Sequence, residues 1–244
     1  MRYAIISDIH SNIEALGAFL KETEKLSVDK VVCLGDLVGY NANPNECVDT
    51  ARERKFLCVM GNHDSRAAGL EEAADFNLMA AEAIEWTRGV LTGENRDFLK
   101  NLPRTLEVDG KFLAVHGWVN NTDLYIFGAQ YARRNFDLLK EYKKTNLCFF
   151  GHTHVAISYL EVEGAVEMRL DNTLAIEKGV GYLINPGGLG QPRDRDPRAS
   201  FLVYDTKAQE VNFYRVEYDI NATTEKILSA GLSPRLAERL KLGW

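Results

Sequence analysis

All five histidines of this chain lie in short polar segments that also carry aspartate, asparagine or glycine. These segments, with one further aspartate-bearing segment, are Ser7-Asp8-Ile9-His10, Leu34-Gly35-Asp36, Gly61-Asn62-His63-Asp64, Val115-His116-Gly117 and Gly151-His152-Thr153-His154. Imidazole and carboxylate ligands together suit manganese, iron, cobalt, nickel or zinc, whereas an all-oxygen set suits magnesium or calcium. No Cys-x-x-Cys pair occurs, which argues against a structural zinc site with thiolate ligands. The residue types therefore predict a centre that holds two transition-metal ions.

Each segment taken alone has an ordinary structural explanation. A single buried histidine is more often a hydrogen-bonded core residue than a ligand, and Gly35-Asp36 has the composition of a turn. Gly61-Asn62 likewise has the composition of a loop start. Their shared placement favours the metal site, because each segment lies at or just after the end of an apolar, β-prone run. In open α/β sheets, ligands bind outside the carboxyl ends of the strands.

The spacing within two of the segments adds a geometric argument. Successive residues of an extended chain point to opposite faces, so Asp8 and His10 project to the same side if the strand continues. The same holds for His152 and His154. We therefore expect both residues of each pair to face the metal centre.

The elements that must position these residues alternate in the first part of the chain. The sequence predicts strands at 3–6, 31–34 and 56–60 and helices at 12–26, capped by Ser11, and from Asn43-Pro44-Asn45 to Arg54. This βαβαβ order predicts parallel strands with right-handed crossovers. After His154 the pattern is antiparallel, with strands at 155–162, 165–170, 180–184, 201–204 and 211–216, followed by helices at 222–230 and 234–242.

Two stretches leave alternatives open. Residues 66–102 carry a helical apolar stripe and predict either a pair of helices that packs on a sheet or a cap that shapes the substrate pocket. Residues 118–131 carry four aromatic side chains just after His116 and predict either a partner surface or part of the core.

Composition indicates an ordinary globular protein. The 244 residues, 45% hydrophobic and 26% charged, suffice for one large α/β domain. We predict one domain over residues 1–244, with a helical insertion at about 66–102 and C-terminal helices at about 222–242. The formal net charge of −6 disfavours a nucleic-acid-binding domain.

The four cysteines predict free thiols, because three lie in apolar strand runs and Cys47 lies in an expected helix. A reducing cytoplasm is the expected compartment. A strand leads directly to Asp8, which leaves no room for a signal peptide, and no stretch approaches the ~18 apolar residues of a membrane span. The sequence gives no indication of the oligomeric state.

The order of the polar segments resembles that of the calcineurin-like metallophosphoesterase family, from Arg2 to about Glu217. The resemblance implies an α/β fold in four layers, with two mixed β-sheets flanked by helices. It implies that each of two divalent transition metals, manganese first among the candidates, has three ligands of its own and shares a seventh. These ligands are Asp8, His10 and His154 for one metal, Asn62, His116 and His152 for the other, and Asp36 as the bridge.

The resemblance also implies a catalytic histidine. His63 would face the scissile phosphate, oriented by Asp64, and would donate a proton to the leaving oxygen or stabilise charge there; general acid catalysis of this kind is typically worth ~10²–10⁴-fold. The alternative is that His63 only caps a helix. A hydroxide that bridges two metals ~3.5–4 Å apart would attack phosphorus in line.

The segment Asn185-Pro186-Gly187-Gly188-Leu189-Gly190-Gln191-Pro192-Arg193 resembles the small bacterial and archaeal branch of that family. This chain departs from the branch at Gly188, where a serine is frequent, and at Trp118-Val119, where Ser-Pro is frequent. Neither departure touches an expected ligand, so an atypical substrate pocket is expected. Arg193 is the residue expected to bind substrate phosphate; the alternative is that it pairs with Asp194 or Asp196 on the surface.

Three functions fit the sequence. The first is hydrolysis of small phosphodiesters or nucleotides, including dinucleoside polyphosphates, as the small members of the family imply. The second is a phosphomonoesterase that acts on nucleotides or phosphoproteins. The third is a non-catalytic scaffold on the same fold, but scaffolds lose ligands or the catalytic histidine, and this chain keeps all eight positions. A DNA nuclease would need a basic capping domain, which this sequence lacks.

Overall fold

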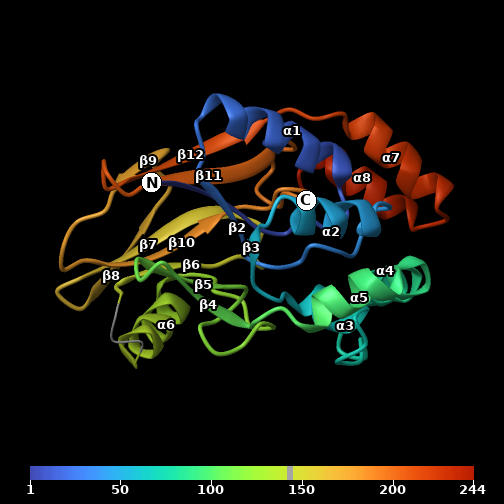
Figure 1. Cartoon of the computed structure of the whole chain (residues 1–244). Helices are drawn as coiled ribbons and strands as arrows, with labels where there is room; N and C mark the ends of the chain where they lie inside the picture. Colours follow the sequence, from blue (N-terminus) through green and yellow to red (C-terminus); the bar gives the residue numbers. More distant parts are fainter. Residues whose placement is uncertain (142–144) are drawn as a thin grey trace.

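The computed structural model describes residues 1–141 and 145–244, which form two six-stranded β-sheets packed face to face (Figure 1). The first sheet has the order β3 (Leu57–Cys58), β2 (Lys30–Cys33), β1 (Arg2–Ile6), β11 (Ala199–Asp205), β12 (Glu210–Val216) and β9 (Thr173–Ala175). The second has the order β4 (Thr105–Val108), β5 (Phe112–Val115), β6 (Leu147–Phe149), β10 (Gly181–Pro186), β7 (Ala156–Val162) and β8 (Ala165–Arg169). Both sheets contain parallel and antiparallel pairs, which confirms the expected class and architecture.

Helices cover the outer faces of the sheets (Figure 1). Helices α1 (Ile13–Lys25) and α2 (Pro44–Glu53) lie on the first sheet, and α6 (Ala129–Glu141) lies on the second. Helices α7 (Ile220–Ser229) and α8 (Pro234–Leu242) pack on each other, and α7 also contacts α1. Helices α3 (Asn62–Ala67), α4 (Leu78–Val90) and α5 (Gly93–Lys100) lie together beside α2.

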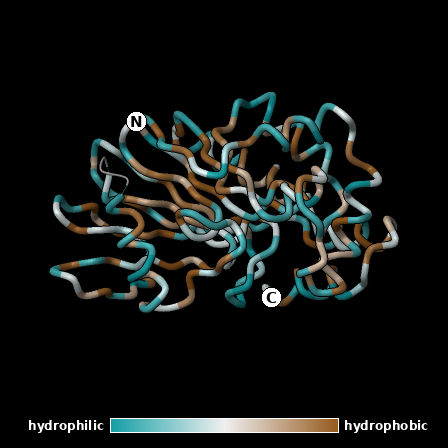
Figure 2. Tube along the Cα trace, turned by 90° about the horizontal axis from the view of Figure 1, so that it is seen from below, coloured by the Kyte–Doolittle hydropathy of each residue, from teal (hydrophilic) through white to brown (hydrophobic). Residues whose placement is uncertain are grey.

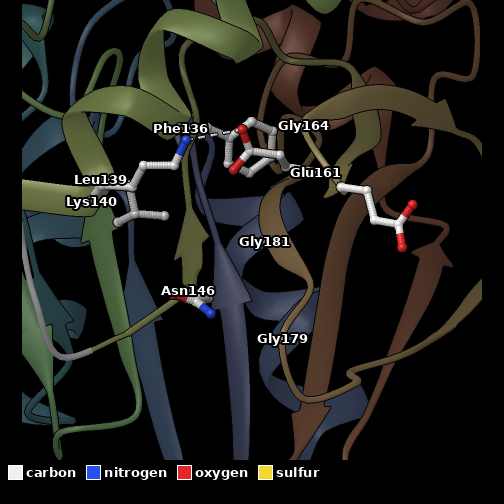
Figure 3. Close-up of a pocket in the computed structure, with 9 residues that line it drawn as sticks. Phe136, Leu139, Lys140, Asn146, Glu161, Gly164, Gly179 and Gly181 are labelled. Atoms are coloured by element: carbon white, nitrogen blue, oxygen red, sulfur yellow. Dashed lines mark hydrogen bonds and ion pairs between the residues drawn. The ribbon is translucent and has the colours of Figure 1, made fainter.

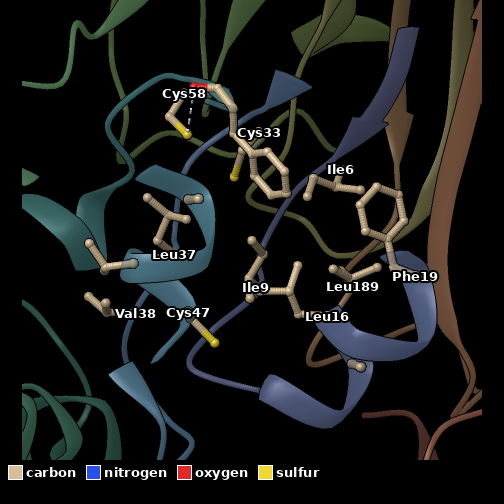
Figure 4. Packing of buried hydrophobic residues seen from close by; sticks show 14 of the residues in the cluster. Ile6, Ile9, Leu16, Phe19, Cys33, Leu37, Val38, Cys47, Cys58 and Leu189 are labelled. Atoms are coloured by element: carbon tan, nitrogen blue, oxygen red, sulfur yellow. Dashed lines mark hydrogen bonds between the residues drawn. The ribbon is translucent and has the colours of Figure 1, made fainter. Parts of the chain in front are cut away.

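Three layers of apolar side chains hold this arrangement together. Rings of Tyr3, Phe112 and Phe149 pack between the two sheets. A second layer, which includes Leu16 and Phe19 of α1, fills the space between the first sheet and its helices (Figure 4), and a third joins α6 to the second sheet. The hydropathy trace shows the same pattern, with apolar stretches along the strands and hydrophilic ones mainly in the outer loops (Figure 2).

Most expected elements occur, with shifted ends. The parallel order of β1, β2 and β3 is confirmed, as are the two C-terminal helices. The expected cap of α1 is wrong: Asn12, not Ser11, accepts the hydrogen bond from the Ala15 N–H at 3.0 Å, because Ser11 itself lies in a left-handed turn with φ 57°. The short strands β4 and β9 and the helix α6 are elements that the sequence analysis did not predict. No helix in the described ranges is long and apolar enough to cross a membrane.

Candidate metal centre

The polar segments follow strand ends that meet at one edge of both sheets. Asp8, Asp36 and Asn62 come after β1, β2 and β3 of the first sheet, and His116 and His152 come after β5 and β6 of the second. Because each set of strands runs parallel, their carboxyl ends lie on the same side. All nine predicted ligands and catalytic residues are buried, with at most 5% of their surface exposed.

Left-handed turns, not extended strands, position four of these side chains. Asp8, His10, His152 and His154 have φ values of 57°, 47°, 66° and 58°. The argument from strand alternation is therefore wrong for both pairs, although Asp8 and His10 do reach one group while His152 and His154 reach two different ones. Such backbone conformations cost of order 1 kcal/mol or more each and concentrate at functional sites.

Asp8, His10 and His154 form the first group. Nε2 of His10 lies 3.3 Å from Nε2 of His154 and 3.8 Å from Oδ1 of Asp8, and Nε2 of His154 lies 3.3 Å from the same oxygen. Oδ1 of Asp8 is buried and accepts no hydrogen bond from the described residues. One carboxylate oxygen and two imidazole nitrogens that point toward one another fit a divalent transition metal.

Asp36, His116 and His152 form the second group, with Asn62 beside it. Oδ2 of Asp36 lies 3.3 Å from Nε2 of His116 and 3.6 Å from Nε2 of His10, so this carboxylate faces both groups. The side-chain oxygen of Asn62 lies 3.2 Å from Nε2 of His116. The seven expected ligands are thus brought together in two groups that meet at Asp36; their ligation of metal stays a prediction.

Backbone carbonyl groups orient the imidazole rings. Nδ1 of His10 lies 3.0 Å from the carbonyl oxygen of Val38, and Nδ1 of His116 lies 2.7 Å from that of Leu34. Nδ1 of His154 lies 2.5 Å from the carbonyl oxygen of Gln191. An Nδ1–H group that donates to a carbonyl leaves the lone pair of Nε2 facing the centre. His152 is reversed, because its Nε2 lies 3.2 Å from the carbonyl oxygen of Asp123 and Nδ1 remains for a metal.

Asp64 makes no hydrogen bond to the buried Nδ1 of His63; any orientation of this ring by Asp64 acts through the backbone. Its carboxylate accepts the backbone N–H groups of Gly61, Asp36 and Val38 at 3.0, 2.8 and 3.2 Å. Asp64 therefore fixes the backbone of the loop that carries Asp36 and the turn that begins α3. It positions His63 only through this backbone.

The His63 ring is held by packing. Its centroid lies 4.7 Å from that of His10, 4.5 Å from that of Tyr40 and 4.7 Å from that of Phe76. Its Nδ1 is buried and has no hydrogen-bond partner among the described residues. Gly39, with φ +93°, passes so close that a Cβ there would lie 2.5 Å from this nitrogen. His63 also lies within 4.8 Å of ligand atoms of His10 and Asp36, nearer to the metal groups than expected.

Burial and neighbouring charges set the protonation of the metal-free centre. Burial raises the pKa of the Asp8 carboxyl to about 6 and lowers the pKa of His10 to about 3. Burial also acts to raise the pKa of Asp36, but the attraction of His116 outweighs it and the pKa stays well below its ordinary value. Burial acts to lower the pKa of His116, and Asp36 raises it to about 9. Asp36 and His116 are thus an ion pair until a cation replaces the proton.

A cavity of about 170 Å³ opens onto the centre. Asn62, His63 and His152 form its floor, and residues 75–77 and Ala80 form one wall. This wall precedes and begins α4, so part of residues 66–102 shapes the cavity, while Ile84 of α4 and Leu99 of α5 also belong to the apolar cluster of the first sheet; both interpretations of the segment stay open. A larger cavity of about 300 Å³ lies between α6 and the end of β7, where Lys140 pairs with Glu161 at 3.1 Å (Figure 3), and no predicted site residue lines it.

The aromatic stretch after His116 supports the centre. The Tyr125 ring stacks on the His152 ring, with centroids 3.9 Å apart and an interplanar angle of 11°, and Phe127 stacks beside Tyr125. Tyr125 lines the cavity and is 39% exposed. Residues 118–131 are therefore neither only a partner surface nor only part of the core, because Tyr125 is partly exposed and also packs on His152, an expected ligand.

Arg193 points to the centre, not to the surface. Its Nη2 lies 3.3 Å from Oε1 of Gln191 and 3.4 Å from the hydroxyl of Tyr40. The alternative of a surface ion pair is wrong for Arg193, because Arg215 binds Asp194 and Arg198 binds Asp196 at 2.6 Å. At Gly188 a Cβ would lie 2.8 Å from the carbonyl oxygen of Gln191, so the serine of related sequences would force this loop to shift.

Sequence reasoning missed Arg66, whose side chain is 5% exposed. Its guanidinium pairs with Glu71 at 3.2 Å, Asp75 at 2.8 Å and Asp123 at 2.9 Å. Arg66 therefore links Asp75 of the cavity wall to Asp123, whose carbonyl oxygen contacts His152. One signal was present: Arg66 lies four residues after Asn62, one helical turn away on the same face. Tyr40 and Asp123, which line the cavity, were missed as well, because no motif in the sequence marks either of them.

Comparison with known proteins assigns the family. Residues 1–209 match the calcineurin-like phosphoesterase superfamily domain. The chain is 40% identical over 245 aligned positions to an uncharacterized protein of Methanocaldococcus jannaschii, covering 98% of this chain and 97% of that protein. A metallophosphoesterase from Sphaerobacter thermophilus is 40% identical, with a TM-score of 0.87 over 100% of this chain and 99% of that one. A hypothetical protein from Pyrococcus horikoshii, 22% identical, has the same fold, with a TM-score of 0.82 over 100% and 98% of the two chains.

The chain belongs to the calcineurin-like phosphoesterase superfamily, and it is a hydrolase of phosphoric esters. Its family uses divalent metal ions, and the histidine and aspartate groups at the strand ends have the composition and geometry to hold them.

Proposed function

We propose that this protein is a dinuclear metal-dependent phosphoesterase that hydrolyses small phosphodiesters or nucleotides, including dinucleoside polyphosphates. The observation that carries the proposal is the pair of buried ligand groups that both face Asp36, next to a cavity that Asn62 and His152 line. A cavity of about 170 Å³ favours a small ester over a phosphoprotein. The chain also keeps the buried His63 that a scaffold does not need.

Two bound divalent ions would supply a hydroxide near neutral pH and offset charge on the phosphoryl oxygens. The first would be held by Asp8, His10 and His154, the second by Asn62, His116 and His152, with Asp36 between them. We infer that His63 protonates the leaving oxygen or stabilises charge there, because its ring lines the cavity beside the two ligand groups. Phe76 and Tyr40 pack against that ring and hold it in place.

Two further proposals concern organisation. Residues 1–244 act as one domain, since Leu236 and Leu240 of α8 pack in one cluster with Tyr40, in the loop that follows β2, and with Ala80 of α4. The cytoplasm remains the proposed compartment, because Cys33, Cys47, Cys58 and Cys148 are all free and buried.

The test is metal analysis followed by a panel of esters. The protein is purified without added metal, reconstituted separately with manganese, iron, nickel, cobalt and zinc, and assayed with a synthetic diester, a monoester, nucleotides and dinucleoside polyphosphates. We expect up to two metals per chain, the highest activity with manganese, and loss of activity on chelation. Turnover of monoesters alone would favour the phosphomonoesterase alternative, and metal binding without any turnover would favour the scaffold.

A further inference from the structure

Two arginines from different parts of the chain meet at Tyr40. The guanidinium carbon of Arg193 lies 5.9 Å from the centroid of the Tyr40 ring, and that of Arg239 lies 5.7 Å from it. The same ring is 4.6 Å from His10 and 4.5 Å from His63. Two positive charges therefore lie next to the metal ligands and the proposed catalytic histidine.

Among the residues described, no aspartate or glutamate lies within ion-pair distance of either guanidinium, and the nearby Asp8 carboxylate acts on Arg193 only at longer range. Arg193 donates to Gln191 and Tyr40, and Nε of Arg239 donates to the backbone oxygen of Trp244 at 2.9 Å; neither arginine forms an ion pair with an aspartate or glutamate. Nε of Arg193 is buried without a partner. Burial, and then repulsion from Arg193, lowers the pKa of Arg239. Contact with an aromatic ring is worth only about 0.5–2 kcal/mol per cation, so like charges that are partly buried together favour an anion.

The fold fixes both arginines in place. Arg239 lies on α8, whose Leu236 and Leu240 are buried against Tyr40 and α4. The end of α8 is joined to the Arg193 loop, because the Arg195 N–H donates to the carbonyl oxygen of Gly243 at 2.9 Å. The packing therefore fixes the two backbone positions that carry these arginines beside Tyr40. Arg239 also lies outside residues 1–209, the part that matches the family domain.

We propose that Arg193 and Arg239 bind a second phosphoryl group beside the scissile one, so that the substrates are esters with two linked phosphates. The inference rests on the proposed phosphoesterase function and names its substrate class. Guanidinium groups suit this role because each can bind phosphate oxygens through two parallel N–H groups. A substrate with a single phosphate would reach the metals but leave this site unused.

The test measures binding and needs no turnover, so that it remains informative if no ester is hydrolysed. Dissociation constants of methylenediphosphonate and methylphosphonate are determined by calorimetry on the manganese-loaded protein. We expect the two-phosphate probe to bind more tightly, and Arg239→Met to lower its affinity by about tenfold or more relative to that of the one-phosphate probe, as for a lost charged hydrogen bond. Arg239→Lys keeps the charge but not the paired N–H groups, so its affinity for the two-phosphate probe should lie between those of the parent protein and of Arg239→Met.

The matched control is Lys241→Met, which removes a positive charge from an exposed position of the same helix. It should keep the parental ratio of the two dissociation constants, and it also controls for removal of metal by the probe. An unchanged ratio in Arg239→Met, or an equal loss of affinity for both probes, overturns the second phosphate site. Melting temperatures of the variants show that each remains folded.

Discussion

The side-chain nitrogens of His10 and His154 lie 3.3 Å apart, Nε2 to Nε2, although 144 residues separate the two in the chain. Nδ1 of each ring is engaged by a backbone carbonyl oxygen, so in the neutral rings both Nε2 lone pairs point into the same space. Burial keeps the rings neutral, because it lowers the pKa of His10 to about 3 and the pKa of His154 well below its ordinary value. Two lone pairs and the Asp8 carboxylate repel one another unless a cation lies between them.

Asp36 is the one residue whose loss should affect both metals. We expect Asp36→Ala to reduce metal content at both sites and to abolish activity, because its carboxylate faces both ligand groups. His154→Ala, which touches only the first group, should lose one metal. Metal content is measured by mass spectrometry on desalted protein. Two metals bound to Asp36→Ala as tightly as to the parent protein would contradict the bridging assignment.

His63 should matter for turnover more than for metal. We expect His63→Ala to lower kcat by ~10²-fold or more, as for loss of a proton donor, and to leave metal content near the parental value. His152→Ala, by contrast, should lose metal. Steady-state kinetics and metal analysis on the same preparations separate the two roles. Parental turnover in His63→Ala would contradict the catalytic role; the alternative of a helix cap is wrong, because Gly61 is the N-cap of α3 and His63 lies inside the helix.

Arg193 should affect substrates unequally. Arg193→Ala is expected to raise KM for dinucleoside polyphosphates much more than for a small synthetic diester, because only the former extend to its guanidinium. The control is Arg198→Ala. Arg198 lies in the same loop, but its guanidinium pairs with Asp196 away from the centre. Equal and small changes for both substrates would place Arg193 outside the substrate site.

Arg66 is expected to position His152 through Asp123. Arg66→Met removes a buried guanidinium that joins three carboxylates, so we expect unfolding free energy to fall by about 1–3 kcal/mol. The affinity for the metal at the His152 group should fall by about 10–100-fold, as for other losses of a residue that orients a ligand. Arg52→Met, whose partners Asp49 and Glu94 lie on the surface, should not change metal affinity. Denaturant unfolding and metal titration give the two quantities.

The ion pair between Arg2 and Asp205 gives a stability term that depends on pH. The hydrogen bond from Arg2, 2.9 Å long, lowers the pKa of Asp205 to about 2. A carboxyl with a lowered pKa in the folded state contributes stability above its unfolded pKa and loses it as pH falls through the folded value. Because the pair is partly exposed, Arg2→Ala should cost little stability at pH 6, and this cost should shrink as pH falls from about 4 through 2. Urea unfolding of both proteins across this range measures the difference, and a difference that does not depend on pH would contradict it.

The sequence was sufficient for the fold class and for bringing the ligands together, because strand ends and ligand residues coincide along the chain. It was insufficient for local geometry. The alternation argument failed at Asp8 and His10 because both residues adopt left-handed turns, which apolar periodicity does not report. The sequence also did not show how Asp64 acts on His63, because the Asp64 carboxylate accepts backbone N–H groups of Asp36 and Gly61 that only the folded loops bring to it. Arg239 was missed because only tertiary packing brings α8 to Tyr40.

The expected ligands come from both sheets. Asp8 and Asp36 follow strands of the first sheet, and His116 and His152 follow strands of the second. Each bound ion would therefore serve as a non-covalent cross-link between two layers that otherwise adhere through apolar contacts. Such a link stabilises the folded state by RT ln(1 + [metal]/Kd), about 2.7 kcal/mol at a hundredfold excess over Kd. Metal supply would then set the stability of this protein as well as its chemistry, and loss of metal would loosen the contact between the sheets at the edge where the cavity lies.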